Sequence, residues 1–347
     1  MNRLPAEWEP QSGVMLTWPH ADTDWAEQLD AVEALYAELA AMISEYESVL
    51  IVCRDEKHAA HARARVTAKA ADPARLHLAL APSNDTWARD HGPITVLDEQ
   101  GAPRVLDFRF NGWGGKFAAE LDTQITARLH GSGIFGRAPR EAVDLVLEGG
   151  AIESDGQGTL LAVTRTLVDP RRNPGLSRPE IEQMLAERLG IRHFLWLEHG
   201  AISGDDTDGH IDTLARFCAP DIICYASCED PGDADYAALK AMEGELRALR
   251  DHSGKAYRLV GLPPPKPVLD AEGERLPAGY ANFLIINGAV ILPTYGDPAD
   301  AQAAAILAEL FPDRAIRTLD CSTLIRQGGS LHCISMQLPL GALSIPQ

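Results

Sequence analysis

The sequence predicts a mixed α/β fold, and three observations indicate it. Short apolar runs typical of strands alternate along the whole chain with segments whose apolar residues recur at helical spacing. Hydrophobic residues make up 46% of the 347 residues, so the chain can bury a large core. The spacing of these segments suggests several copies of a strand–strand–helix–strand unit, although no residue-level repeat is visible. Such interleaving is typical of the α/β and α+β classes.

The first eighty or so residues contain three predicted strands and two predicted helices. Val14–Trp18, Ser48–Cys53 and Leu76–Ala81 are apolar runs of strand length. Ala26–Glu47 and Glu56–Ala71 lie between these runs and have the length and composition of helices. The last strand leads directly into a polar segment, and such loops at strand ends commonly carry function.

The same alternation continues to the end of the chain. Strands are predicted at Ile94–Asp98, Arg104–Phe110, Ala142–Leu147, Thr159–Val163, His193–Leu197, Thr213–Phe217, Ile222–Tyr225, Arg258–Val260, Phe283–Ile286 and Ala289–Pro293. Helices are predicted at Ala118–His130, Arg178–Leu189, Asp233–Arg250 and Asp300–Leu310. The proline-rich Gly261–Pro267 is short enough for a loop, and no segment is typical of a linker. We therefore expect a single domain over residues 1–347.

Net charge, apolar runs and cysteine content indicate which partners the protein can have and in which compartment it works. The net charge of −19 argues against nucleic acid and favours a cationic ligand, although it also serves solubility alone. No apolar run reaches the ~18 residues of a membrane helix, and the N-terminus lacks the apolar core of a signal peptide. Six cysteines in so long a chain fit reduced thiols. These features predict a cytoplasmic protein with no membrane partner.

Cys333 is a candidate nucleophile. It follows Gly328 and Gly329 in a Gly-Gly-Ser-Leu-His-Cys segment, and glycines allow close backbone approach. A cysteine reacts as the thiolate, so it needs a base or a cationic neighbour. The alternative is a buried cysteine that acts as a small hydrophobe.

His210 and Asp212 lie two positions apart, directly after a glycine. If Ile211–Phe217 is extended, alternation places both side chains on one face of the strand. The acidic run Asp205–Asp208 just before them could also form a cation-binding loop. Because the run lacks the full calcium-loop pattern and its distal glutamate, we do not predict a metal site.

Two further carboxylates have informative neighbours. Asp90 follows Trp87, and a ring face beside a carboxylate suits a cation; the alternative is a turn in which Arg89 pairs with an acid. Glu148 ends an apolar strand before two glycines, where a buried carboxylate needs a partner. It could orient the imidazole of His210, as the third member of a catalytic relay does, or it could be a helix cap or a surface acid.

The remaining polar residues carry weaker signals. Cys224 and Cys228 lie four positions apart without a second pair at zinc spacing. We expect His20 to be structural. No phosphate loop, dinucleotide fingerprint or serine nucleophile elbow is present.

Six segments resemble, in order, those of the agmatine deiminase family. That family also contains bacterial peptidylarginine deiminases and belongs to the guanidino-modifying pentein superfamily. The segments are Pro5–Gln11, Asn84–Pro93, Phe110–Gly115, Leu147–Ile152, Gly209–Asp212 and Gly328–Cys333. The resemblance extends to about Pro339 and implies a five-bladed α/β propeller (pentein) of pseudo-symmetric ββαβ units, with the active site on the pseudo-symmetry axis.

The resemblance also implies roles for individual residues. By it, Cys333 is the nucleophile, His210 the general acid/base, Glu148 the acid that holds the histidine, Asp90 and Asp212 the clamp on the guanidinium, and Trp87, Trp113 and Asn282 further substrate-pocket residues. No metal or organic cofactor is expected, because sulfur and imidazole can supply both half-reactions.

The implied reaction is hydrolysis of agmatine to N-carbamoylputrescine and ammonia through a covalent thiouronium, a step of polyamine biosynthesis toward putrescine. The secreted peptidylarginine deiminase places arginines where this chain has Gly112–Gly114, which fits a substrate without a carboxylate. Three alternatives stay open: a deiminase of free or peptidyl arginine, an amidinotransferase, and a non-catalytic polyamine-binding protein. The sequence leaves a homodimer open as the assembly.

Overall fold

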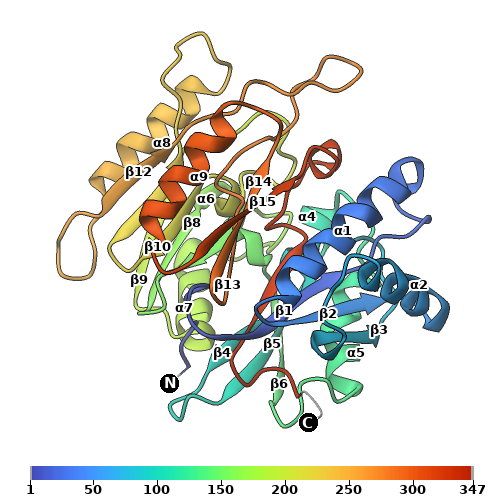
Figure 1. Cartoon of the computed structure of the whole chain (residues 1–347). Helices are drawn as coiled ribbons and strands as arrows, with labels where there is room; N and C mark the ends of the chain where they lie inside the picture. The colour runs from blue at the N-terminus through green and yellow to red at the C-terminus, as the bar shows by residue number, and fades with distance from the viewer. Residues whose placement is uncertain (1, 345–347) are drawn as a thin grey trace.

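The strands of this protein form five small sheets. The structure is a computed structural model that describes residues 2–344; residues 1 and 345–347 of the expected 1–347 domain lie outside the described part. Four of the sheets have three strands, and the other has four. Figure 1 shows the units following one another from blue to red, so that the last strands return to the first.

The elements are the following. The strands are β1 (Gln11–Thr17), β2 (Ser48–Cys53), β3 (Leu76–Leu80), β4 (Ile94–Leu97), β5 (Pro103–Arg109), β6 (Arg140–Val146), β7 (Ile152–Ser154), β8 (Thr159–Val163), β9 (His193–Leu197), β10 (Ala215–Ala219), β11 (Ile222–Ala226), β12 (Arg258–Leu262), β13 (Leu284–Ile286), β14 (Ala289–Thr294), β15 (Ala315–Asp320) and β16 (Ser335–Pro339). The helices are α1 (Leu29–Ser44), α2 (Glu56–Thr67), α3 (Ala88–His91), α4 (Gly112–Gly115), α5 (Ile125–Gly131), α6 (Thr164–Leu167), α7 (Arg178–Leu189), α8 (Tyr236–Ala248) and α9 (Ala299–Leu310).

Each three-stranded sheet repeats one pattern. The first two strands pair antiparallel, and the third joins parallel to the second. A parallel partner requires a crossover, which α5, α7, α8 and α9 supply in the four units. This is the ββαβ unit that the sequence predicts, and the prediction of the fold class is confirmed.

The four-stranded sheet joins the two ends of the described chain. Its order is β16-β1-β2-β3, and β16 pairs antiparallel with β1 in the place of a first strand. β2 is parallel to β1 after α1, and β3 adds a further parallel strand after α2. The fifth blade therefore combines the chain's early strands with its last one.

Five apolar clusters lie between neighbouring blades and close the ring. In β2, Val49 and Ile51 belong to the cluster shared with the blade of β13–β15. Leu50 and Val52 belong to the cluster shared with the blade of β4–β6. β8 and β14 divide their side chains between two clusters in the same way. Because side chains alternate along a strand, a middle strand buried on both faces must be apolar throughout. This explains why these strands are continuous apolar runs in the sequence.

Several boundaries differ from the predicted ones. β7, β15 and β16 were not predicted: β7 has three residues, and β15 is largely exposed or half-buried. The helix predicted at Ala118–His130 begins only at Ile125, after a short turn at Asp122–Gln124. The carboxylate of Asp122 accepts hydrogen bonds from the backbone of Asn84 and Asp85, which ties this turn to the segment after β3.

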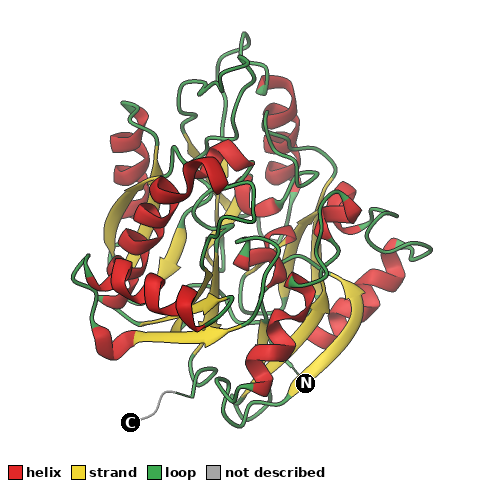
Figure 2. Ribbon diagram, turned by 90° about the vertical axis from the view of Figure 1, so that its right-hand side faces the viewer, coloured by secondary structure: helices red, strands yellow, loops and turns green. Residues whose placement is uncertain are grey.

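Long loops gather at one end of the molecule, as Figure 2 shows. The loop between β12 and β13, drawn orange in Figure 1, extends beyond the ends of the strands. Within residues 2–344, no helix has both the length and the apolar character needed to cross a membrane.

Candidate active site

A pocket of about 300 Å³ opens among these loops, with Cys333 in its wall. Trp87, Asp90 and Trp113 line it beside the cysteine. Its other acidic lining residues are Asp24, Asp85, Asp206, Asp270 and Glu274. Six carboxylates face this space against two arginines, so the pocket favours a cation.

The glycines before Cys333 are required by the geometry. Gly328 adopts a φ of 79°, in the left-handed region. A β-carbon on Gly329 would lie 2.3 Å from the ring of Trp87, so any side chain there would displace the indole. These two glycines let the loop pass close to the tryptophan and deliver Cys333 to the pocket.

The thiol of Cys333 is surrounded by acceptors. Its Sγ lies 3.4 Å from Oδ1 of Asn282 and 3.8 Å from Oδ2 of Asp212. Burial, and then the carboxylates of Asp212 and Asp90, raise the pKa of the Cys333 thiol well above its ordinary value. In the unliganded site the cysteine is therefore a thiol, and a bound cation would be needed to favour the thiolate.

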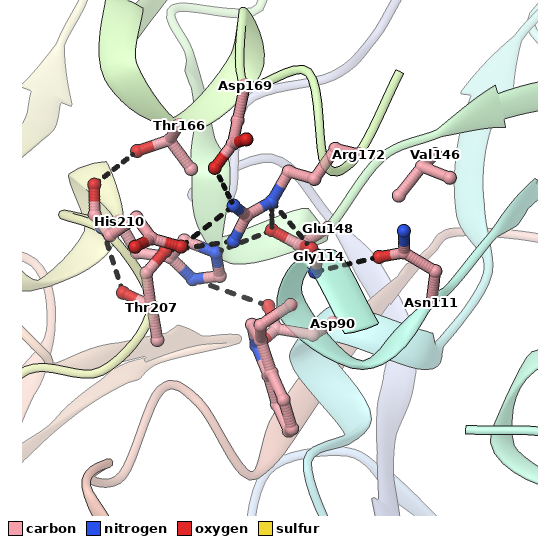
Figure 3. Close-up of polar contacts among 12 residues, drawn as sticks. Asp90, Asn111, Gly114, Val146, Glu148, Thr166, Asp169, Arg172, Thr207 and His210 are labelled. Atoms are coloured by element: carbon pink, nitrogen blue, oxygen red, sulfur yellow. Dashed lines mark hydrogen bonds and ion pairs between the residues drawn. The ribbon is translucent and has the colours of Figure 1, made fainter. Parts of the chain in front are cut away.

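His210 is held on one side by Glu148. Its Nε2 lies 2.9 Å from Oε2 of Glu148, and both side chains are almost fully buried. Figure 3 shows the guanidinium of Arg172 on the other side of Glu148. Arg172 Nε donates to both carboxylate oxygens, at 2.9 and 2.8 Å, and Asp169 and Asp208 accept its further hydrogen bonds. Glu148 is thus fixed before any ligand binds.

The second ring nitrogen of His210 is free of hydrogen bonds among the described residues. This Nδ1 lies 3.6 Å from Oδ1 of Asp90, as Figure 3 shows. Burial disfavours a charged imidazole, but Asp90, Glu148 and Asp212 outweigh it and raise the pKa of His210 to about 9. At neutral pH the ring is an imidazolium with one proton that it can transfer.

Asp90 lies in the short helix α3 and is nearly inaccessible. Oδ1 accepts the N–H of Gly150 at 3.0 Å, and Oδ2 accepts Nε1–H of Trp113 at 2.9 Å. Burial raises the pKa of Asp90 to about 6, although His210 opposes the shift. A β-carbon built on Gly150 would lie 2.5 Å from His210 Nδ1 and 2.9 Å from Asp90 Oδ1. The same point is 3.1 Å from Asp212 Oδ2, so three reactive groups converge there.

Asp212 reaches the site by a different backbone from the one predicted. Ile211–Thr213 form a 3-10 turn, and the strand begins at Ala215, so the prediction of an extended His210–Asp212 pair is wrong. The tight turn, rather than strand alternation, brings both side chains inward. The Ile-Asp-Thr sequence has strand propensity, but the turn is favoured because Thr213 Oγ1 donates to the backbone carbonyl of His210 at 2.9 Å.

The carboxylate of Asp212 is fully buried and bonded on one oxygen only. Oδ2 lies 2.8 Å from Nδ1 of His332, while Oδ1 has no hydrogen-bond partner among the described residues. Burial would raise its pKa, but His332 and His210 outweigh that effect and hold the pKa of Asp212 below its usual value. Oδ2 of this ionised carboxylate also lies 3.8 Å from Sγ of Cys333, whereas Oδ1 is the buried oxygen without a partner among the described residues.

The predicted pocket residues occupy different positions. Trp87 and Trp113 line the pocket, and Trp113 adopts a φ of 55° in a glycine-rich turn. Asn282 lies behind the thiol instead, where its Oδ1 accepts the backbone N–H of His332 at 2.9 Å. Arg89 lies on the far side of α3, with Nη2 3.8 Å from Glu7. Asp90 therefore faces the pocket beside Trp87, and Arg89 pairs with an acid on the other side of the same turn, so both interpretations of this segment agree with the geometry.

Of the other sequence candidates, Asp206 lines the pocket, and the rest lie outside its wall or are already paired. Asp208 lies 2.9 Å from both Lys116 and Arg172, and Asp205 accepts the N–H of Gly209. In the described part of the chain, no cluster of His, Cys, Asp and Glu could hold a metal ion. His20 lies against Ser83, away from the pocket. All six cysteines are buried and free.

Sequence reasoning missed the charged groups behind the site. These are Glu7, Glu153, Arg172, Arg216 and the role of His332. Glu7 and His332 do lie in segments that carry the family resemblance, which was a usable signal. Their contact joins positions 325 apart, however, and follows only from closure of the ring.

Comparison with known proteins identifies the family. The model of the Porphyromonas-type peptidyl-arginine deiminase family matches residues 3–339. The agmatine deiminase of Stutzerimonas stutzeri is 34% identical, and the match covers 97% of this chain and 95% of that protein.

Solved structures agree with this assignment. A Porphyromonas gingivalis protein provisionally described as an arginine deiminase is 48% identical with a TM-score of 0.92, covering 99% of this chain and 100% of that one. A cysteine-to-serine variant of the C. jejuni agmatine deiminase with substrate bound is 36% identical with a TM-score of 0.89, covering 97% and 96%. The chain belongs to the Porphyromonas-type peptidyl-arginine deiminase family, among whose members it is similar to agmatine deiminases.

Proposed function

We propose that this protein is a cysteine-dependent hydrolase that converts agmatine and water to N-carbamoylputrescine and ammonia. The observation that carries the proposal is the position of Cys333 in an acidic pocket, next to the carboxylates of Asp90 and Asp212. A thiol, an imidazolium and two acids around one point are what hydrolysis of a guanidinium carbon requires.

The guanidinium binds between Asp90 and Asp212, and Oδ1 of Asp212 has no hydrogen-bond partner of its own among the described residues. Its planar N–H fork matches two carboxylates, and each charge-assisted hydrogen bond contributes roughly 1.5–3 kcal/mol. Trp87 and Trp113 bound the same space and offer ring faces to the cation. Binding thus places the guanidinium carbon in front of the sulfur before any bond forms.

In the first half-reaction the bound cation offsets the negative charge of Asp212 and Asp90, which otherwise disfavours the thiolate of Cys333. Cys333 ionises, its proton passes to solvent, and Sγ forms a bond to the guanidinium carbon. The carbon–nitrogen bond then breaks, and the departing ammonia takes a proton from His210. An S-alkylthiouronium and a neutral imidazole remain.

In the second half-reaction water attacks the thiouronium carbon. His210 takes one proton from the water as the new carbon–oxygen bond forms. The carbon–sulfur bond then breaks, and the remaining hydroxyl proton passes to the departing sulfur, so that Cys333 returns to the thiol. Glu148 keeps the imidazole oriented through both steps and stabilises its charged form. The products are the ureido compound and ammonia.

The substrate tail decides between agmatine and arginine. Acidic residues at the pocket rim, among them Asp206, Asp270 and Glu274, suit the ammonium group of agmatine and repel a carboxylate. The second candidate, deimination of free or peptidyl arginine, would need a cation for the carboxylate of its substrate. Arg326 lines the pocket without an ion pair among the described residues and could bind a carboxylate.

A substrate panel tests the proposal. Ammonia release from agmatine, arginine and a blocked arginine peptide should be greatest for agmatine, and Arg326→Gln should leave the agmatine rate unchanged. Preference for arginine that falls with Arg326→Gln would support the second candidate. Identification of the ureido product excludes an amidinotransferase, and turnover by itself excludes a binding protein.

The nucleophile has its own test. Cys333→Ala should abolish turnover but still bind agmatine, and mass spectrometry of quenched wild-type enzyme should find an adduct on Cys333. Ammonia release by the variant, or an adduct on another cysteine, would end the covalent proposal.

We also propose that the chain acts as a single domain in the cytoplasm, where six buried and unpaired thiols stay reduced. A homodimer stays a prediction, to be checked by light scattering.

A further inference from the structure

We propose that His332, the residue before the nucleophile, is an imidazolium that keeps Asp212 ionised and in place. His332 would then be a positioning residue that acts through Asp212. The inference rests on the proposed function in one respect, namely that Asp212 binds the guanidinium. The charge state of His332 itself is independent of any substrate.

Both ring nitrogens of His332 face carboxylates. Nδ1 lies 2.8 Å from Oδ2 of Asp212, and Nε2 lies 2.7 Å from Oε2 of Glu7. A neutral imidazole has one N–H and one lone pair, so it could satisfy only one of these acceptors. The other contact would set two lone pairs against each other at hydrogen-bond distance. Two N–H groups, and therefore a positive charge, satisfy both.

A proton on one of the carboxyl groups would be the alternative. Glu7 is an unfavourable place for it, because Arg216 Nη2 donates to Glu7 at 2.9 Å and Ile285 N donates at 2.7 Å. Despite burial, Arg216, His332 and Arg89 hold the pKa of Glu7 far below its usual value. For Asp212, apart from His332 itself, His210 and Arg216 also lower the pKa. The proton therefore belongs to the ring.

The charged groups in the network that holds His332 balance one another with this assignment. The charged groups are Glu7, Glu153, Asp212, Arg89, Arg216 and His332, all buried. Glu153 accepts from Arg216 at 2.9 Å, and Arg89 Nε donates to the backbone carbonyl of His332 at 3.3 Å. Three anions then face three cations in this group, and the imidazolium of His210 adds a further positive charge near Asp212. The thiol of Cys333, in the next position, is neutral in the unliganded site.

The arrangement has a consequence for substrate binding. His332 occupies Oδ2 of Asp212 and leaves Oδ1 open. A fully buried carboxylate would otherwise tend to take up a proton and lose its attraction for a guanidinium. His332 offsets that tendency through its contact with Oδ2, the oxygen that also lies 3.8 Å from Sγ of Cys333.

The charge state can be measured directly. In protein labelled with ¹⁵N at histidine, both ring nitrogens of His332 should give protonated N–H signals at pH 7. The signals are assigned by their loss in His332→Gln. A ring with one unprotonated nitrogen at pH 7 would overturn the inference. Since no substrate is present, failure of the proposed function leaves this result unaffected.

The positioning role is measured by binding. In a Cys333→Ser background, which prevents turnover, His332→Gln should weaken agmatine binding roughly 10- to 100-fold at neutral pH. The loss should be greater at pH 6 than at pH 9, because an unsupported Asp212 takes up a proton as the pH falls. A merely structural role would weaken binding equally at both.

A matched control separates this effect from the loss of a histidine in general. His130 is half-buried and bonds to the backbone carbonyl of Ala138 at 3.1 Å, outside the site. His130→Gln should leave the Kd and its pH dependence unchanged. If His332→Gln fails to fold, Glu7→Asp, which shortens the acid that holds Nε2, should give a smaller loss with the same pH trend. Unchanged binding in a folded His332 variant would reject the role.

Discussion

Two buried series of histidine, glutamate and arginine approach the carboxylates of Asp90 and Asp212, and they differ at one nitrogen. The series are His210–Glu148–Arg172 and His332–Glu7–Arg216. In the first, the carboxylate lies 2.9 Å from the ring and 2.8 Å from the guanidinium. In the second, the corresponding distances are 2.7 and 2.9 Å. The same three residue types therefore hold both imidazoles by Nε2.

The second nitrogen sets the two rings apart. Nδ1 of His210 has no hydrogen bond among the described residues, whereas Nδ1 of His332 is tied to Asp212 at 2.8 Å. A ring with a hydrogen bond at only one nitrogen can exchange the proton of its other nitrogen with a ligand. A ring with hydrogen bonds at both nitrogens keeps both protons and is a fixed charge. The comparison teaches that the free nitrogen, rather than the residue type or burial, distinguishes an acid–base group from a structural cation.

The largest expected effect comes from removing the free nitrogen. His210→Gln should lower kcat roughly 10²- to 10⁴-fold, the range for loss of a general acid–base group. Its effect on agmatine affinity in the Cys333→Ser background should be much smaller than that of His332→Gln. Steady-state rates and calorimetric titration measure the two quantities. Equal losses in affinity from the two variants would erase the distinction between the rings.

Breaking the fixed series should chiefly affect stability. Glu7→Gln leaves buried cations without a partner and should lower the free energy of unfolding by about 3–5 kcal/mol. Glu9→Gln is the matched control, because Glu9 pairs with Arg3 in the same segment but both side chains are partly exposed. It should cost no more than about 1 kcal/mol. Urea denaturation of both variants checks this, and equal costs would contradict the fixed role of Glu7.

The pH profile should reflect the exchangeable series. Asp90 must be ionised to bind the guanidinium, so kcat/KM should fall as the pH drops through its pKa of about 6. His210 must carry its proton to release ammonia, so kcat/KM should also fall as the pH rises through its pKa of about 9. A bell-shaped profile between these limbs is expected. A profile without an alkaline limb would remove His210 as the acid.

The smallest effect should come from the donor on Asp90. Trp113→Phe removes the N–H that Oδ2 of Asp90 accepts, so agmatine affinity should fall about 5- to 10-fold. Because that N–H favours the carboxylate form, the acid limb of kcat/KM should move to higher pH. Trp196→Phe, remote from the pocket, controls for loss of an indole. An acid limb that stays in place would show that Trp113 does not act on Asp90.

The predicted fold depended on strands that bury both faces. β2, β8 and β14 are continuous apolar runs, and such runs were visible in the sequence. β7 and β15 were not, because a three-residue strand and a partly exposed edge strand have no comparable pattern. The family resemblance, rather than periodicity, supplied the number of blades.

The site divides in the same way. Cys333, His210 and Asp90 could be proposed because glycines or an aromatic residue stand beside each in the chain. The bent backbone at Asp212 could not be predicted, since Ile211–Phe217 is locally compatible with a strand. The partners of His332 could not be predicted either, because Glu7 and Asp212 come close to it only when the blades close into a propeller.

The pairing of β1 with β16 also sets the order in which the protein can mature. Four blades, from β4 to β15, are complete in a growing chain that has reached Asp320, while β1 still has an open edge. Cys333 and the strand that covers this edge emerge from the ribosome only afterwards. An unfinished chain thus exposes a strand edge prone to aggregation, and it gains its nucleophile in the same final event that seals the ring.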